Sequence, residues 1–220
     1  MGITGLAATL CKPIIVRDLG YLIIENLYSN LELKFIWNEI KHIDYVLDHV
    51  FDDKAKEEHR KSHNTMADDS SGSLMTGFGI SLDTFYTDRK FSSILTFNRK
   101  IMKTDITEQF KNINNENSAY GLINTDFTLL NKYKKGEQYK KHRDSSSFSA
   151  VTFLSKTALN GGGLQFCDYG VTVPFKNNSC VIFPSRAYHN TEDIKSNTDR
   201  YSISQFMTIR YFTNRFGHKG

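Results

Sequence analysis

The second half of the chain, from about residue 120, is a series of short apolar runs separated by turn-forming residues. Most runs are rich in Val, Ile, Phe, Leu or Thr, and Gly, Asn, Pro or Ser lies between them. The runs cover residues 127–130, 138–139, 150–154, 164–166, 171–173, 180–183 and 201–209. Short strands at this spacing along the sequence, with turn signals between them, are typical of an all-β sandwich or barrel. This pattern favours a β core over a helical bundle.

The first half of the chain has a different pattern of apolar residues, with helical spacing. Residues 21–25 predict a short strand, and residues 30–50 predict an amphipathic helix capped by Ser29 or Asn30. Apolar residues recur at helical spacing in that stretch, at Leu33, Ile36, Trp37, Ile40, Ile43, Val46, Leu47 and Val50. Trp37 belongs to this stripe and is predicted to lie in the core. A second, weaker helical period covers residues 82–97.

Composition narrows the class of protein. A length of 220 residues fits one domain, and a net charge of +4 gives no argument for nucleic-acid binding. Cys11, Cys167 and Cys180 are too scattered for a disulfide framework or a cysteine-type zinc site. Reduced thiols, no apolar run of ~20 residues and no signal-like start lead us to expect a cytoplasmic protein without a membrane span.

Two histidines and one aspartate are spaced as ligands of one metal ion. His142 and Asp144 are two positions apart, so on a strand their side chains leave the same face. His189 follows 45 residues later (189 − 144 = 45), far enough to return on another strand. Two imidazoles and a carboxylate form the facial triad of non-haem Fe(II) oxygenases, with positions left open for a co-substrate and O2. Arg200 then supplies a planar cationic fork that suits a carboxylate.

Each of these residues is a weak signal alone, because a histidine on a strand is more often structural than metal-binding. Two other readings use the same residues: a cupin-like zinc or manganese protein, and a non-catalytic jelly-roll metal-binding module. The module is disfavoured because all three ligands and Arg200 are intact. In a cupin-like protein, Arg200 and Tyr133 would have no role.

The ligand run resembles a known family. Tyr133-Lys-Lys-Gly-Glu-Gln-Tyr139-Lys-Lys-His142-Arg-Asp144 matches the Y-x-x-G-x-x-Y-x-x-H-x-D motif of prolyl 4-hydroxylase-like 2-oxoglutarate/Fe(II) dioxygenases. Gly162-Gly-Leu-Gln-Phe166 is similar to the family's G-G-x-T-x-F, although Gln165 departs from it. Arg200-Tyr-Ser-Ile-Ser204 resembles the R-Y-A-I-T segment of the prolyl hydroxylases that act on hypoxia factors. The resemblance covers roughly residues 120–210.

This resemblance implies an α+β fold with a mainly β core. The core would be a double-stranded β-helix, that is, a distorted jelly roll, with N-terminal helices packed on one sheet. We expect a single 2-oxoglutarate/Fe(II) dioxygenase domain over residues 1–220. Residues 1–118 would supply an N-terminal strand and supporting helices, and residues 119–212 the jelly-roll catalytic core. We expect the polar segment 52–80 and the loop 145–149 to shape the substrate entrance.

The resemblance also implies the roles of individual residues. Fe(II) would be held by His142, Asp144 and His189, and the C5 carboxylate of 2-oxoglutarate by Arg200. Further co-substrate contacts are expected from Tyr133, Ser202, Ser204 and Lys156. O2 would be the oxidant, succinate and CO2 the products, and ascorbate an optional further cofactor. Family members that halogenate lack the carboxylate ligand, so Asp144 favours hydroxylation.

The substrate is expected to be a prolyl or other residue of a peptide or protein. A free amino acid or small metabolite is the alternative, because the same residues serve both. Six basic residues against one acid in 132–143 suggest steering of an acidic substrate or nucleic acid, but a solvated face is the preferred interpretation. Phe206 stands where an R-x5-R signature of nucleic-acid demethylases requires arginine, which disfavours nucleic acid. The oligomeric state stays open.

Overall fold

The computed structural model describes residues 8–56, 58 and 75–210. Most of the segment 52–80, which we expect near the substrate entrance, lies outside the described residues. The α-helices are α1 (Asn30–His49), α3 (Leu82–Phe85), α4 (Ser93–Phe97) and α5 (Thr104–Lys111). Three short 3-10 helices lie between or after them: η1 (Arg89–Phe91), η2 (Asn98–Met102) and η3 (Glu116–Leu122). No helix in these ranges is long and apolar enough to cross a membrane.

Two antiparallel sheets form the β core. The larger has seven strands in the order β1-β2-β8-β5-β10-β4-β3, and the smaller has three in the order β7-β6-β9. The large sheet consists of β1 (Leu10–Val16), β2 (Leu19–Glu25), β8 (Ser179–Pro184), β5 (Phe148–Leu154), β10 (Arg200–Thr208), β4 (Thr125–Tyr133) and β3 (Phe78–Ser81). The small sheet consists of β7 (Val171–Val173), β6 (Leu164–Phe166) and β9 (His189–Thr191). This arrangement confirms the predicted distorted jelly roll.

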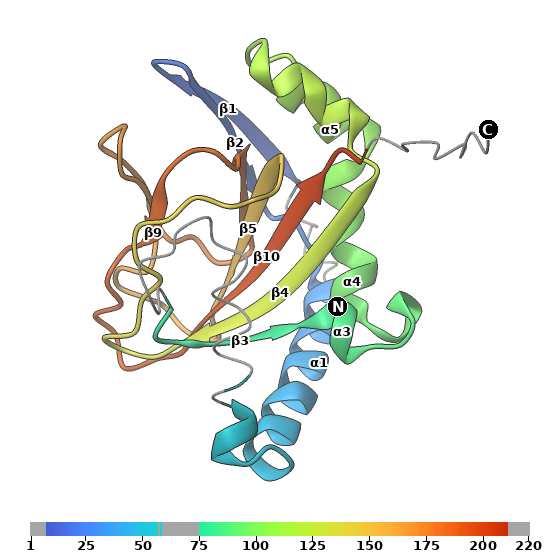
Figure 1. Cartoon of the computed structure of the whole chain (residues 1–220), viewed down its shortest axis with the longest axis vertical. Helices are drawn as coiled ribbons and strands as arrows, with labels where there is room; N and C mark the ends of the chain where they lie inside the picture. The colour runs from blue at the N-terminus through green and yellow to red at the C-terminus, as the bar shows by residue number, and fades with distance from the viewer. Residues whose placement is uncertain (1–7, 57, 59–74, 211–220) are drawn as a thin grey trace, which may run out of the picture.

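The large sheet separates two hydrophobic layers. In Figure 1 the helices lie on one side of this sheet, while β9 of the small sheet lies on the other. The helix-side layer contains Ile36, Ile40 and Ile43 of α1, which pack with apolar residues of β5, β8 and β10. The inter-sheet layer includes Phe153 and Phe166, which lie on different sheets. The alternation of side chains along β10 therefore sends one set of residues to the helices and the other to the space between the sheets.

Helix α1 confirms the amphipathic pattern read between residues 30 and 50. It begins with a capping box, in which the Ser29 hydroxyl accepts from the Glu32 amide and the Glu32 carboxylate accepts from the Ser29 amide. Trp37 is half-buried at the edge of the core, edge-on to the ring of Tyr201. The weaker period at 82–97 is not one helix: it divides into α3, η1 and α4. Ser81, Asp88 and Ser92 each cap one of these pieces.

Candidate metal and co-substrate site

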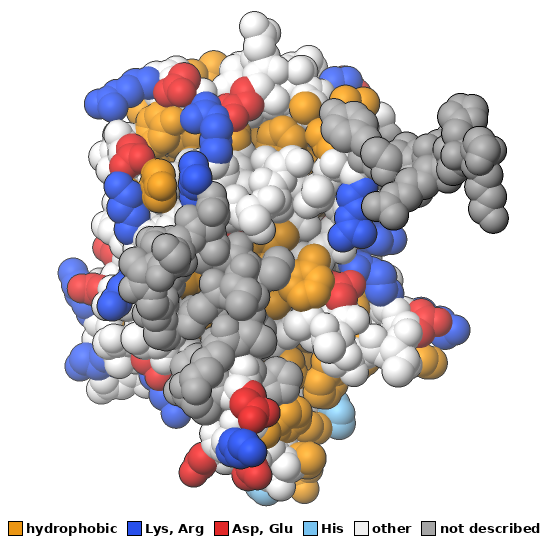
Figure 2. All heavy atoms as spheres, viewed as in Figure 1, with side chains coloured by type: hydrophobic (Ala, Val, Ile, Leu, Met, Phe, Trp, Pro, Cys, Tyr) orange, Lys and Arg blue, Asp and Glu red, His pale blue; other side chains and the backbone are white. Residues whose placement is uncertain are grey.

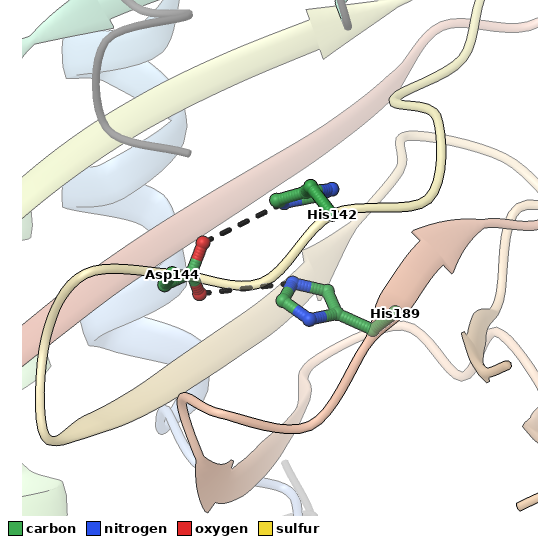
Figure 3. Close-up of side chains that lie close together, drawn as sticks. All are labelled: His142, Asp144 and His189. Carbon is green, nitrogen blue, oxygen red and sulfur yellow. Dashed lines mark ion pairs between the residues drawn. The ribbon is translucent and has the colours of Figure 1, made fainter. Parts of the chain in front are cut away.

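His142, Asp144 and His189 come together between the two sheets. His142 and Asp144 lie on the segment that joins β4 to β5, and His189 is the first residue of β9 (Figure 3). One Asp144 oxygen, Oδ1, lies 3.5 Å from Nε2 of His142, and Oδ2 lies 3.7 Å from Nε2 of His189. One potential ligand atom from each residue lies within 4.8 Å of the others, and all three side chains are buried. No other such group of three His, Cys, Asp or Glu occurs among the residues that the structure describes.

The backbone holds the two histidines against each other. The amide of His142 donates to the carbonyl of His189 at 2.9 Å, and the amide of His189 donates back at 2.8 Å. Each ring is then oriented through Nδ1, which lies 2.7 Å from the carbonyl oxygen of Lys140 in one case and 2.9 Å from that of Ala187 in the other. A carbonyl oxygen only accepts, so each Nδ1 carries a proton and Nε2 is the ring nitrogen left to bind a metal. These Nε2 atoms are the ones that face Asp144.

The charge state of the triad suits a divalent cation. Burial lowers the pKa of His189 to about 4, so this imidazole is neutral near pH 7. Burial also raises the pKa of Asp144, whereas His142 and a hydrogen bond from Ser149 act in the opposite direction. Neutral imidazole nitrogens and one carboxylate are ligands that Fe(II) accepts, and a cation among them would compensate a carboxylate that burial otherwise penalises. The donor set therefore fits the metal that the sequence predicts.

Arg200 lies at the start of β10 and is 1% exposed. Its Nε donates to the carbonyl oxygen of Gly162 at 2.6 Å, and its Nη1 donates to Ser202 Oγ at 3.3 Å. The guanidinium lies over two rings, with its Cζ 5.1 Å from the centroid of Tyr133 and 5.4 Å from that of Phe153. Burial lowers the pKa of Arg200 to about 10, which still leaves it cationic at neutral pH. Within 8–56, 58 and 75–210, no carboxylate pairs with this buried cation.

One cavity is lined by Arg200 and by the predicted metal ligands. Its lining contains every predicted site residue except Lys156, together with several that the sequence did not point to. The lining residues are Leu129, Asn131, Tyr133, Tyr139, His142, Asp144, Ser149, Ala150, Val151, Leu164, His189, Thr191, Arg200, Ser202, Ser204 and Phe206. Tyr133 pairs with Arg200 in the β4–β10 register, and burial raises the pKa of its hydroxyl to about 12. The hydroxyl is therefore a neutral donor at physiological pH.

Lys156 does not line this cavity. Ala150 and Leu154 of β5 belong to the helix-side layer, so the alternation of this strand directs position 156 to the helix side and not into the cavity. The Lys156 side chain is exposed, and its Nζ lies 5.7 Å from the ring centroid of Trp37, a residue of α1 on the helix side of the large sheet. Arg200 is thus the one predicted co-substrate cation that the structure brings to the cavity.

Two polar residues of the cavity, on the strands that flank β10, were not predicted from the sequence. Asn131 of β4 is buried and donates to Ser204 Oγ at 3.0 Å, while its carbonyl oxygen has no hydrogen-bond partner. Ser149 of β5 donates to the Asp144 carboxylate at 2.5 Å. Both lie on inward-facing positions of strands that flank β10. A period-2 reading of β4 and β5, extended from Leu129 and Val151, would have identified them.

The basic segment 132–143 is partly neutralised. Lys132 is half-buried and pairs with Asp44, and Lys141 pairs with Asp168. Lys134, Lys135, Lys140 and Arg143 are exposed. Figure 2 shows basic and acidic side chains interspersed on the face that it presents. These pairs are consistent with the solvated face that the sequence favours over a steering surface.

Comparisons with known proteins agree with this site. Residues 128–208 match the family model described as the 2OG-Fe(II) oxygenase superfamily. A prolyl 4-hydroxylase from Pseudomonas putida has a similar structure, with a TM-score of 0.56 and 13% identity over 89% of this chain and 96% of that one. A Trichoplax adhaerens prolyl hydroxylase, solved with a hypoxia inducible factor peptide fragment, gives a TM-score of 0.57 at 11% identity over 86% and 83%. No curated protein matches the sequence.

The matched segment identifies one class of protein: residues 128–208 of this chain match the 2OG-Fe(II) oxygenase superfamily. The fold of the chain is the prolyl 4-hydroxylase-like double-stranded β-helix. At 11% and 13% identity the likeness establishes the fold alone and leaves the substrate open.

Proposed function

We propose that this protein is a 2-oxoglutarate- and Fe(II)-dependent dioxygenase that hydroxylates a C–H bond of a prolyl or other residue in a peptide or protein. The observation that carries the proposal is the cavity with a buried, carboxylate-free Arg200 at one place and the His142, Asp144 and His189 group at another. A buried cation without a counter-ion is costly, and an anionic ligand relieves that cost. A dicarboxylate that also chelates iron would neutralise Arg200 with one carboxylate and bind the metal with its other end.

The residues of the cavity would have separate roles in binding the metal and the co-substrate. His142 and His189 present Nε2 lone pairs, and Asp144 presents a carboxylate oxygen, to hold Fe(II). Arg200 would bind the C5 carboxylate of 2-oxoglutarate, with its fork already oriented by Gly162 and Ser202. When bound, these groups supply the oxidation: 2-oxoglutarate and O2 become succinate and CO2, while one oxygen atom enters a substrate C–H bond.

The remaining lining residues would orient the ligands and exclude water. Tyr133 is a neutral hydroxyl donor beside Arg200, and Ser202 and Ser204 follow at alternate positions of the same strand. Apolar side chains of Leu129, Val151 and Phe206 cover the rest of the cavity. A dry, shaped cavity strengthens the electrostatic contacts made inside it and limits side reactions.

The peptide or protein substrate is the finer part of the proposal. It is supported by the fold shared with the Trichoplax prolyl hydroxylase, which was solved with a peptide fragment. Hydroxylation of a free amino acid or small metabolite uses the same residues. A succinate-release assay with prolyl peptides and with free amino acids, run in parallel, separates the two. Turnover of free amino acids alone would remove the peptide assignment and keep the dioxygenase.

The proposal as a whole is tested by anaerobic titration of the Fe(II)-loaded protein with 2-oxoglutarate. Chelation produces a visible metal-to-ligand charge-transfer band, which we expect in the wild type. Asp144→Ala and Arg200→Ala should weaken or abolish the band. Arg210→Ala is the matched control, because this exposed arginine lies outside the cavity. No band in a wild type that binds iron normally would refute the co-substrate assignment and favour a cupin-like or non-catalytic metal protein.

A further inference from the structure

The Asp144 carboxylate is held by a serine of the large sheet. Ser149 Oγ donates to Asp144 Oδ2 at 2.5 Å, and Ser149 itself is 1% exposed. Its strand neighbours on the same inward face, Val151 and Phe153, are apolar and belong to the inter-sheet core. A hydroxyl at such a position lowers stability unless it is hydrogen-bonded. The hydroxyl of Ser149 therefore contributes through its hydrogen bonds and not through packing of the core.

Two further serines continue this contact. Ser185 Oγ lies 2.7 Å from Ser149 Oγ, and Ser146 Oγ lies 2.7 Å from Ser185 Oγ. Ser185 is fully buried, whereas Ser146 is half-buried at the outer end. Ser185 also fixes the backbone of the ligand, because its carbonyl oxygen accepts from the Asp144 amide at 3.0 Å. The four residues connect the metal-binding segment to the end of β8 and the start of β5.

The direction of these hydrogen bonds follows from counting protons. A carboxylate only accepts, so the single hydroxyl proton of Ser149 is donated to Asp144 in a hydrogen bond. Ser149 must then accept from Ser185, and Ser185 must accept from Ser146. Ser149 and Ser185 each donate one bond and accept one, an arrangement in which the bonds polarise one another. Ser146 begins the row and also lies 3.2 Å from the carbonyl oxygen of Phe148. The row therefore delivers a strengthened donor to one oxygen of Asp144, Oδ2.

We infer that Ser146, Ser185 and Ser149 are positioning residues that make Asp144 a one-oxygen metal ligand. The inference rests on the proposed function, since it concerns the same metal. Ser149 donates to Oδ2, the oxygen 3.7 Å from His189 Nε2, and this bond favours Oδ1, 3.5 Å from His142 Nε2, as the oxygen that binds the metal. A carboxylate that binds through both oxygens takes a coordination position that the co-substrate or O2 requires. The serine row thus preserves the open positions, as hydrogen-bond partners of metal ligands generally tune a site.

The test is Co(II) binding to the metal-free protein. Calorimetry measures the affinity, and the visible spectrum reports the coordination of the bound ion. Co(II) alone is the probe, so no turnover is needed. Ser149→Ala should weaken Co(II) binding by about 10-fold or more, the range found for partners of metal ligands. It should also change the visible spectrum, because Oδ2 becomes free to bind. Ser185→Ala should give a smaller loss, and Ser146→Ala the smallest.

Controls separate positioning from simple loss of stability. Ser155→Ala removes a serine of similar burial, whose hydroxyl donates to the Asp199 carbonyl away from the metal ligands. It should leave Co(II) affinity and spectrum unchanged. Ser149→Thr keeps the hydroxyl and should restore most of the affinity. If Ser149→Ala does not fold, the Ser185→Ala variant, which leaves the Asp144 contact in place, carries the test with its smaller expected loss of Co(II) affinity.

The outcomes are distinct. A wild type that does not bind Co(II) contradicts the proposed metal site itself. A wild type that binds, with Ser149→Ala and Ser185→Ala unchanged in affinity and spectrum, overturns the serine inference alone. Equal losses in Ser149→Ala and Ser155→Ala also overturn it, because they indicate a general effect on the fold. A graded loss with an altered spectrum supports it.

Discussion

Arg200 is fixed by contact with Gly162: its Nε donates to the Gly162 carbonyl oxygen, and its Cδ lies 3.0 Å from where a Cβ on Gly162 would stand. Gly162 also has a φ of +76°, a conformation that residues with a Cβ rarely adopt. The glycine therefore both permits the turn and leaves room for the cation.

Gly162→Ala is expected to lower the free energy of unfolding and to weaken 2-oxoglutarate binding. The backbone strain alone costs about 1–2 kcal/mol, and the added methyl group also contacts Leu159 and Arg200. Gly136→Ala is the matched control, since Gly136 has a φ of +78° with nothing within 4 Å of its Cβ position. Urea unfolding and co-substrate titration of both variants measure the difference. Equal effects in the two variants would show that the contact with Arg200 is unimportant.

Arg200→Met should abolish the stabilisation that 2-oxoglutarate gives to the Co(II)-loaded protein. A ligand at 100 times its dissociation constant stabilises the state that binds it by about 2.7 kcal/mol, which raises the melting temperature. We expect this shift in the wild type and none in the variant at the same concentration, because the buried cation is lost. Thermal unfolding with and without 2-oxoglutarate is the measurement. A full shift in Arg200→Met would place the co-substrate elsewhere.

The metal-free protein should lose stability as the pH falls from about 6.5 to about 4. Burial lowers the pKa of His189 from 6.5 to about 4, so within this window the unfolded chain binds a proton that the folded chain does not. Stability is therefore present above 6.5 and lost on acidification, by about 3 kcal/mol for a shift of this size. Urea unfolding across this range, with His189→Gln as reference, isolates the effect. Parallel pH profiles for the two proteins would contradict it.

Asn131→Leu should weaken 2-oxoglutarate or substrate binding by about 2- to 10-fold, the worth of one hydrogen bond, with little effect on the fold. The reason is that the Asn131 carboxamide lines the cavity and its carbonyl oxygen is unpaired. Asn98→Leu is the control: Asn98 is also buried, donates to one hydroxyl at 2.7 Å and has an unpaired carbonyl oxygen, but it lies outside the cavity. Calorimetric titration of both variants measures the affinity. An equal change in both would show that Asn131 does not contribute to ligand binding.

The placement of pairs of predicted site residues on one face was predictable because their spacing reports local geometry. Two positions apart on an extended chain means one face, and this placed His142 with Asp144 and Arg200 with Ser202. Lys156 was expected from the resemblance alone, and the period of β5 directs it to the helix side, because Ala150 and Leu154 pack there. The sequence shows where apolar runs stop only approximately, and one residue of error reverses the face.

The remaining site residues depend on long-range register. Ser185 reaches Ser149 only because β8 pairs with β5, and Asn131 reaches Ser204 because β4 pairs with β10. No local pattern specifies which strands pair. The strand β1, with exposed residues on much of its length, likewise lacks the apolar alternation that identified the other strands. The helical layer was predicted where it is long, at α1, and missed where its helices are short, from α3 to η3.

The reciprocal amide bonds between His142 and His189 have a thermodynamic consequence. The conformational entropy of bringing two ligands from distant parts of the chain together is lost when the protein folds, not when the metal arrives. The apo site is in this sense preorganised, and binding has little left to order. The two histidine amides should accordingly resist exchange with deuterium in the metal-free protein almost as well as in the loaded one.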